Sequence, residues 1–258
     1  AFLSVGPKAA GFAVLTRLLV GSFPETSLSA TWLGTLGLLC LFSMVLGNVA
    51  ALQQHNVKRL MAYSSIAQAG YMLLGLLSWG AVAGNATRLD GLGSLLFFIL
   101  TYLFANLGIF TILIAVEQAT GSAETTAFAG LMRRAPFLAV SLLIFFLSLV
   151  GVPPLAGFMA KFSVFGAAIQ TGHGGLALAG ILAGVLSVVY YFSVVREVFF
   201  SAPAEGAGPI RLGSGPTFVL LAALLMTLVV GLYPEPFLNL VRQVAGALGQ
   251  GVEAAAGH

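Results

Sequence analysis

Seven stretches of almost wholly apolar sequence constrain this chain more than any other feature. A membrane-spanning helix needs ~20 mostly apolar residues. Segments of that length cover residues 2–21, 31–52, 60–80, 93–117, 137–170, 175–200 and 214–233. The chain is 59% hydrophobic and only 7% charged, whereas soluble domains are about 25% charged. We therefore predict an all-α polytopic membrane protein with about seven transmembrane helices.

The segments form one predicted transmembrane domain, residues 1–258, which ends in a short C-terminal tail at 234–258. Apolar positions between Phe237 and Leu248 favour an amphipathic helix at the membrane interface for that tail. The first residue is Ala1, and an apolar run follows at once without the charged region that opens a signal peptide. We expect the chain to start inside a larger protein.

Basic residues between the segments predict the orientation in the membrane. The face that carries the connection between the second and third segments receives six of them: Lys58, Arg59, Arg133, Arg134, Arg196 and Arg211. The opposite face receives Arg17, Arg88 and Arg242. Lysine and arginine favour the cytoplasmic side. We expect the first face to be cytoplasmic, with the chain start near it and the C-terminus outside.

The fifth segment is interrupted in its middle by two prolines with glycines on either side: Gly151, Pro153, Pro154 and Gly157. A broken helix at bilayer depth must satisfy its freed backbone groups within protein or water. Lys161 follows in the same segment, where an ionisable group costs roughly 2.5–3.5 kcal/mol. A helix break beside a lysine indicates an ion or proton path. The alternative is that Lys161 snorkels to the interface.

Lys8 is a second ionisable group inside an apolar segment. About 12 helical residues separate it from the membrane exit, which is ~18 Å of depth at a rise of 1.5 Å per residue. Burial disfavours the charged form of a lysine, so a buried lysine can hold or release a proton near neutral pH. We predict a proton relay through Lys8 and Lys161; snorkelling is the alternative for Lys8 as well.

A polar segment runs from His55 to Tyr71. Its composition suits a basic anchor with polar contacts between helices, and it also suits the lining of a hydrated path. The candidates for path lining are His55, Lys58, Tyr63, Ser64, Ser65 and Gln68. Glu117, at the end of the fourth segment, is the one candidate to pair with a buried lysine, and we interpret it first as an interface group.

The sequence offers no motif for redox or metal chemistry. It contains no GxGxxG, Walker A or CxxC motif and no catalytic-triad spacing. Cys40 is the single cysteine, and we interpret it as a small core residue. His173 and His258 belong to no cluster of metal-ligating residues in the sequence. No basic face suits a nucleic acid. We expect no cofactor and no metal in this chain.

Two segments resemble a known family of membrane proteins. Residues His55 to Ile66 resemble the NxKRLxAYSSI segment of the antiporter-like subunits of proton-pumping NADH–quinone oxidoreductase (respiratory complex I) and of related multisubunit cation/proton antiporters. Residues Leu149 to Phe162 resemble the broken helix of that family, GxPPxxGFxxKF. Comparable residues of the subunit called N also occur at Tyr190, Tyr191, Phe192, Arg196, Pro234, Glu235 and Pro236.

The resemblance implies a place within a larger fold. Family members have fourteen helices in inverted repeats, and this chain then corresponds to helices eight to fourteen, the C-terminal half. Lys8 would match the lysine of helix eight in the central hydrophilic axis, and Lys161 the helix-twelve lysine of the proton exit path. Subunit M carries glutamate at the second position, and subunit L continues into a long lateral helix, so subunit N is the most similar.

The resemblance also implies a function: proton translocation in a multi-pass subunit of the bacterial inner membrane, coupled to electron transfer from NADH to quinone on other subunits. FMN and iron–sulfur clusters are expected on those subunits. The expected partners are the lipid bilayer, the neighbouring subunit M and the small subunits K, J and A. The alternatives are a subunit of a sodium/proton antiporter, a structural spacer of the membrane arm, and a small-molecule transporter, which also uses broken helices.

Overall fold

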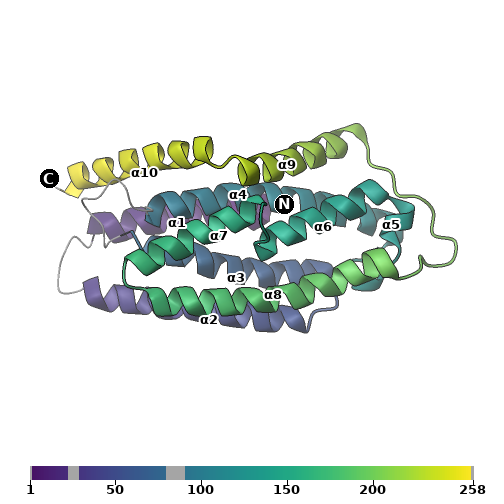
Figure 1. Cartoon of the computed structure of the whole chain (residues 1–258), viewed down its shortest axis with the longest axis horizontal. Helices are drawn as coiled ribbons and strands as arrows, with labels where there is room; N and C mark the ends of the chain where they lie inside the picture. Colours follow the sequence, from purple (N-terminus) through teal and green to yellow (C-terminus); the bar gives the residue numbers. More distant parts are fainter. Residues whose placement is uncertain (1, 23–28, 80–90, 257–258) are drawn as a thin grey trace.

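The computed structural model describes residues 2–22, 29–79 and 91–256, which form a bundle of helices that run largely side by side (Figure 1). The elements are α1 (Phe2–Ser22), α2 (Ser29–Leu52), α3 (Val57–Leu77), α4 (Gly91–Thr120), η1 (Thr125–Phe128), α5 (Leu131–Arg134), α6 (Pro136–Val150), α7 (Ala156–Gln170), α8 (Gly174–Phe200), α9 (Ser214–Leu232) and α10 (Glu235–Ala256). Residues 23–28 and 80–90, which include Arg88, lie outside the described residues, as do Ala1 and His258. The all-α prediction is confirmed.

Five of the described helices are long and apolar enough to cross a membrane: α2, α3, α4, α8 and α9. The fifth predicted segment forms α6 and α7, of 15 residues each, so neither alone has the ~20 residues that spanning needs. The first predicted segment forms α1, which is not among the five. The multi-pass class is confirmed, and the count of seven spans stays a prediction.

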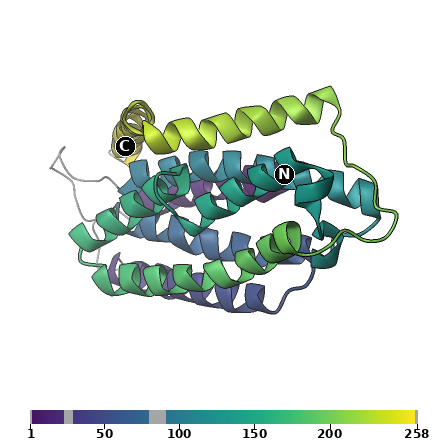
Figure 2. The ribbon, with the colours of Figure 1, turned by 45° about the vertical axis from the view of Figure 1, so that its right-hand side comes forward.

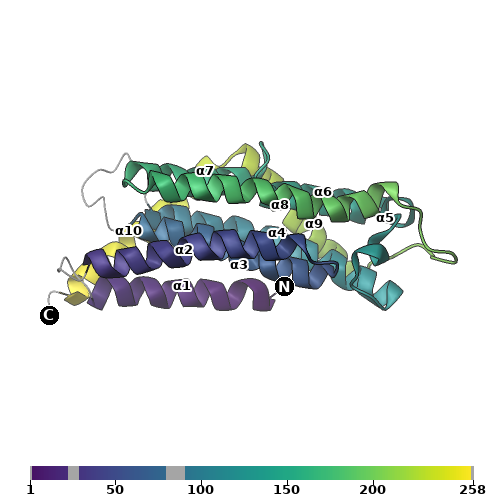
Figure 3. The same ribbon diagram turned by 90° about the horizontal axis from the view of Figure 1, so that it is seen from below.

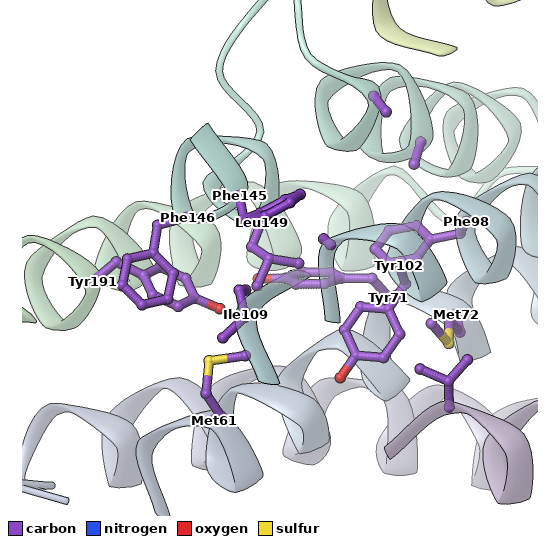
Figure 4. Close-up of a cluster of buried hydrophobic side chains, with 14 of the residues drawn as sticks. Met61, Tyr71, Met72, Phe98, Tyr102, Ile109, Phe145, Phe146, Leu149 and Tyr191 are labelled. Atoms are coloured by element: carbon purple, nitrogen blue, oxygen red, sulfur yellow. The ribbon is translucent and has the colours of Figure 1, made fainter. Parts of the chain in front are cut away.

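α4 lies at the centre of the bundle and contacts α1, α3, α6, α7, α9 and α10. Small residues allow neighbouring helices to approach closely. A Cβ atom added at Gly108 of α4 would overlap the ring of Phe145 in α6, and one at Gly47 of α2 would lie 2.5 Å from the backbone of Ala67 in α3. Figure 4 shows Phe145 and its neighbours in the buried cluster around α4. Glycine at these contacts therefore sets the helix spacing.

Side-chain and backbone hydrogen bonds define the end of the bundle where α2 ends and α3 begins, here called the Lys58 end. The Asn56 side chain accepts from the amides of Lys58 and Arg59, at 3.0 and 3.2 Å. It thereby satisfies donors that a helix start leaves unpaired. The Val57 amide donates to the Ala123 carbonyl at 2.8 Å. These bonds fix where α3 begins and hence the depth of every polar side chain along it.

The C-terminal tail is helical, as predicted for Phe237 to Leu248, and the helix is longer than expected, from Glu235 to Ala256. Figure 2 shows α10 nearly end-on while α9 lies lengthwise across the picture, so the chain turns sharply between the two helices. Leu238 and Val241 are buried on the face toward the bundle, whereas Leu240 is exposed. α10 contacts α1 and α4. Its placement at the membrane interface stays a prediction.

Replacing Gly108 with alanine is expected to destabilise the bundle, because the added methyl group would overlap the buried Phe145 ring. Overpacking of this kind costs typically 1–3 kcal/mol, so about that loss is expected. The measurement is the thermal midpoint of the purified membrane protein. Gly175→Ala is the matched control, because a Cβ atom at Gly175 meets nothing within 4 Å. Equal midpoints for the two variants would contradict the close packing described for Gly108.

Candidate functional site

The helix break between α6 and α7 is closed by local hydrogen bonds. The Gly151 and Val152 amides both donate to the Leu147 carbonyl at 3.0 Å. Gly151 has φ of 95°, in the left-handed region that favours glycine at the end of a helix. The Gly157 amide donates to Ser148 Oγ at 3.0 Å, and an added Cβ at Gly157 would overlap the Ser148 carbonyl. Both glycines of the predicted motif are therefore needed for this geometry.

The two prolines leave two carbonyl groups of α6 without helical donors. In an α-helix the amide of each residue donates to the carbonyl four residues earlier. Pro153 and Pro154 have no N–H, so the carbonyls of Leu149 and Val150 have no such partner. The structure gives both carbonyls side-chain donors. Gln68 Nε2 of α3 donates to Leu149 at 3.4 Å, and Lys161 Nζ of α7 donates to Val150 at 2.8 Å.

Lys161 is buried, with 8% of its surface exposed. Its Nζ lies 5.0 Å from the centre of the Tyr71 ring, on the ring face, a contact that attracts a cation. A Cβ at Gly151 would lie 3.0 Å from Lys161 Cδ, so glycine also leaves room for the lysine stem. Within the described residues no carboxylate forms an ion pair with Lys161. The Val150 carbonyl and the Tyr71 ring therefore hold the Lys161 amine in place, but neither supplies a negative charge to balance an ammonium.

A small cavity of about 10 Å³ borders Lys161. That volume is at the lower limit for a single water molecule. The lining comes from α3, α4, α6 and α7: Gln68, Phe98, Thr101, Tyr102, Ala105, Ser148, Leu149, Gly157 and Lys161. Figure 4 shows three of these side chains, Phe98, Tyr102 and Leu149, gathered in this region. The predicted Gln68 and Lys161 thus face one cavity.

Lys8 of α1 contacts residues of α3 and α4. Its Nζ donates to the Ser65 carbonyl at 2.7 Å and also to the Ser65 hydroxyl. It donates to the Tyr102 hydroxyl at 3.3 Å and lies 4.8 Å from the centre of that ring. Figure 3 shows α1 at one edge of the bundle. Tyr102 therefore contacts Lys8 and lines the cavity of Lys161.

The structure separates the predicted path-lining residues into two groups. Ser64 and Gln68 are buried in the bundle and Ser65 is half-buried. His55, Lys58 and Tyr63 are exposed on the surface of the chain. Lys58 forms an ion pair with Glu117 at the Lys58 end. These exposed residues do not contact Lys8 or Lys161 in the described part of the chain, and a role for them in a path stays a prediction.

Sequence reasoning missed several polar residues of the site. Tyr102 accepts from Lys8 and lines the cavity beside Lys161, and Ser148 accepts from the Gly157 amide across the helix break. A second polar cluster contains the predicted Ser64. Side-chain hydrogen bonds in this cluster join α2, α3 and α8 through Asn48, Tyr71, Tyr190, Tyr191 and Ser64. Asn48, Tyr102 and Ser148, which the sequence analysis did not single out, lie in otherwise apolar segments. A polar side chain at membrane depth was the only signal for each of these residues, and its hydrogen-bond partner depends on how the helices pack.

Similarity to known proteins was found over nearly the whole chain. The subunit N of NADH-quinone oxidoreductase from Moorella thermoacetica is 40% identical over 238 residues, which is 92% of this chain and 48% of that protein. Its counterpart from Chloroflexus aggregans is 42% identical over 96% of this chain and 49% of that protein. The similarity to subunit N predicted from Lys161 and the tail is confirmed. The chain spans about half the length of these relatives.

A chain of the archaeal membrane-bound sulfane sulfur reductase has a TM-score of 0.82 and 28% identity, and the match covers 96% of this chain and 49% of that one. A chain of respiratory complex I from Thermus thermophilus, solved with bound aureothin, has a TM-score of 0.66 and 35% identity over 80% of this chain and 45% of that one. A family model described as NADH:quinone oxidoreductase/Mrp antiporter, transmembrane, matches residues 1–187. The chain belongs to this family and is a multi-pass bacterial membrane protein.

Proposed function

We propose that this chain carries protons between the partly buried Lys8 and the buried Lys161 in a membrane subunit of an NADH:quinone oxidoreductase. The observation that carries the proposal is Lys161 itself: a buried amine held by the Val150 carbonyl beside a helix break, with no ion-pair partner among the described residues. Family membership and similarity to subunit N agree with it. Because the chain covers about half of those relatives, other groups of the whole protein take part.

The contacts of Lys161 suit both protonation states. A carbonyl oxygen accepts a hydrogen bond from either an ammonium or a neutral amine. Burial disfavours the charged form, whereas the Tyr71 ring face favours it. No fixed carboxylate locks the charged form among the described residues. On this proposal, a change in nearby charge loads or unloads this amine.

The proposed path runs from Lys8 to Lys161. Lys8 donates to the Tyr102 hydroxyl, and that side chain lines the cavity beside Lys161. Gln68 and Ser148 contribute further polar groups to the same lining. Lys161 then releases the proton toward the face opposite the Lys58 end, the predicted outside. Moving one charge against 100 mV takes about 2.3 kcal/mol, which corresponds to a roughly 50-fold change in a protonation equilibrium.

A structural spacer would not need a lysine that changes its protonation state. Such a role predicts permanent salt bridges for Lys8 and Lys161, yet their polar contacts within the described residues are carbonyl and hydroxyl oxygens. In the proposed assembly, NADH oxidation uses FMN and iron–sulfur clusters on other subunits. The proposed neighbours are subunit M and the small subunits K, J and A. This chain would contribute proton transfer alone.

Replacing Lys161 with alanine in the whole complex is expected to slow proton transfer through this subunit by roughly 100-fold, the usual effect of losing a positioned acid–base group. Lys161→Arg is expected to fail as well, because arginine keeps the charge but does not release its proton near neutral pH. The measurement is the number of protons moved per NADH oxidised in proteoliposomes. Full pumping by either variant in an intact complex would disprove the relay.

Replacing Tyr102 with phenylalanine tests the link between the lysines. The ring stays beneath Lys8, but the hydroxyl that accepts from Lys8 is lost. Transfer is expected to slow by about tenfold, equivalent to about 1.4 kcal/mol in the barrier. Tyr233→Phe is the control, since Tyr233 is exposed and lies after α9. The readout is again protons per NADH, and indistinguishable values for the two variants would remove Tyr102 from the path.

A further inference from the structure

A chain of polar side chains leads from Lys161 toward the Lys58 end. Tyr71, whose ring lies beneath the lysine amine, accepts from Asn48 Nδ2 at 3.3 Å. Tyr190 donates its hydroxyl proton to Asn48 Oδ1 at 3.1 Å. Its ring packs against that of Tyr191, with centres 4.5 Å apart, and the Tyr191 hydroxyl bonds to Ser64. All five side chains are buried.

This route is short, and it leads toward the Lys58 end, whereas the proposed function releases the proton at the opposite face. Ser64 lies seven residues after Val57, the first residue of α3, which is about 10 Å along the helix. The Tyr71 hydroxyl and Lys161 Nζ both lie near Gly184, at 3.5 and 3.8 Å from the position that a Cβ would take there. If these groups formed a continuous proton chain, a proton on Lys161 would run back to the Lys58 end.

Asn48 is the one link of this chain that does not carry a hydroxyl. A hydroxyl oxygen accepts and donates at the same atom, so it can pass a proton on. An amide accepts at its oxygen and donates at its nitrogen, and a proton taken by one atom does not leave from the other. Asn48 Nδ2 also donates to the Met44 carbonyl at 2.7 Å. Because that carbonyl accepts only, the orientation of the amide is fixed.

We propose that Asn48 is a proton barrier, which holds the hydroxyls of Tyr71 and Tyr190 in fixed accepting and donating roles and so separates Lys161 from the Ser64–Tyr191 cluster. The inference rests on the proposed relay through Lys161 and adds the direction of that relay. Asn48 is 1% exposed and is clamped from α2, α3 and α8 at once. It acts as a positioning residue for the two tyrosines.

The test replaces the Asn48 amide with a group that can relay protons. In the whole complex, Asn48→Asp and Asn48→Ser place a carboxyl or a hydroxyl between Tyr71 and Tyr190. Both variants are expected to raise the passive proton permeability of proteoliposomes without NADH, by about tenfold, since such groups transfer protons and an amide does not. The decay of an imposed pH difference is the measurement. Asn48→Leu, of similar size and without a relaying group, is expected to keep the wild-type permeability.

Two double variants locate the leak. Adding Tyr190→Phe to Asn48→Asp is expected to return the passive proton permeability to the wild-type value, because the neighbouring hydroxyl is gone. Adding Lys161→Ala is expected to have the same effect, because the leak starts at that lysine. Wild-type permeability in assembled Asn48→Asp and Asn48→Ser complexes would overturn the barrier, as would an equal leak in Asn48→Leu or one that persists without Lys161. Pumping by Lys161→Arg tests the relay alone, so a failure of the relay can be told apart from a failure of the barrier.

Discussion

The hydrogen bond from Lys161 to the Val150 carbonyl is the contact on which the site depends. The carbonyl is available because Pro154 supplies no amide to it. The lysine can reach it because Gly151, in a left-handed conformation, leaves space beside the Lys161 stem. A helix break that would otherwise leave a costly unpaired acceptor in the membrane thus becomes the holder of a buried amine. The break supplies an acceptor for the buried Lys161 amine, and the amine supplies a donor for the carbonyl that the break leaves unpaired.

The same break organises its neighbours. Gln68 takes the second freed carbonyl, which ties α3 to α6, and Ser148 ties the end of α6 to the start of α7. α4 brings Tyr102 to the cavity from the centre of the bundle, where Lys8 of α1 meets its hydroxyl. Polar groups from five helices therefore converge at one depth, and close packing at glycines such as Gly108 keeps them there.

The sequence predicted the parts of this arrangement that depend on local chemistry. Composition gave the membrane class, the Pro-Pro pair gave the break, and the improbability of a lysine at membrane depth singled out Lys8 and Lys161. It did not give Tyr102, Asn48 or Tyr190, since a single polar side chain in an apolar helix has no periodic pattern to show which helix it faces. Their partners lie 94, 23 and 142 residues away in sequence. In the polar segment from His55 to Tyr71, the faces of α3 separate the residues: Ser64 and Gln68 point into the bundle, whereas Lys58 and Tyr63 lie on the exposed face.

A buried lysine held by a carbonyl differs in kind from one held by a carboxylate. A carboxylate stabilises the ammonium strongly and makes the loss of its proton costly, whereas a carbonyl and a ring face stabilise it only partly. Such a site responds to distant charge, but it also responds to any proton-conducting group that touches it. The polar cluster beneath Tyr71 is such a contact, and joining it through an amide lets the bundle satisfy its buried tyrosines while the lysine stays insulated from them. A lysine that gains and loses its proton easily therefore needs a neighbouring group, here the Asn48 amide, that does not conduct protons.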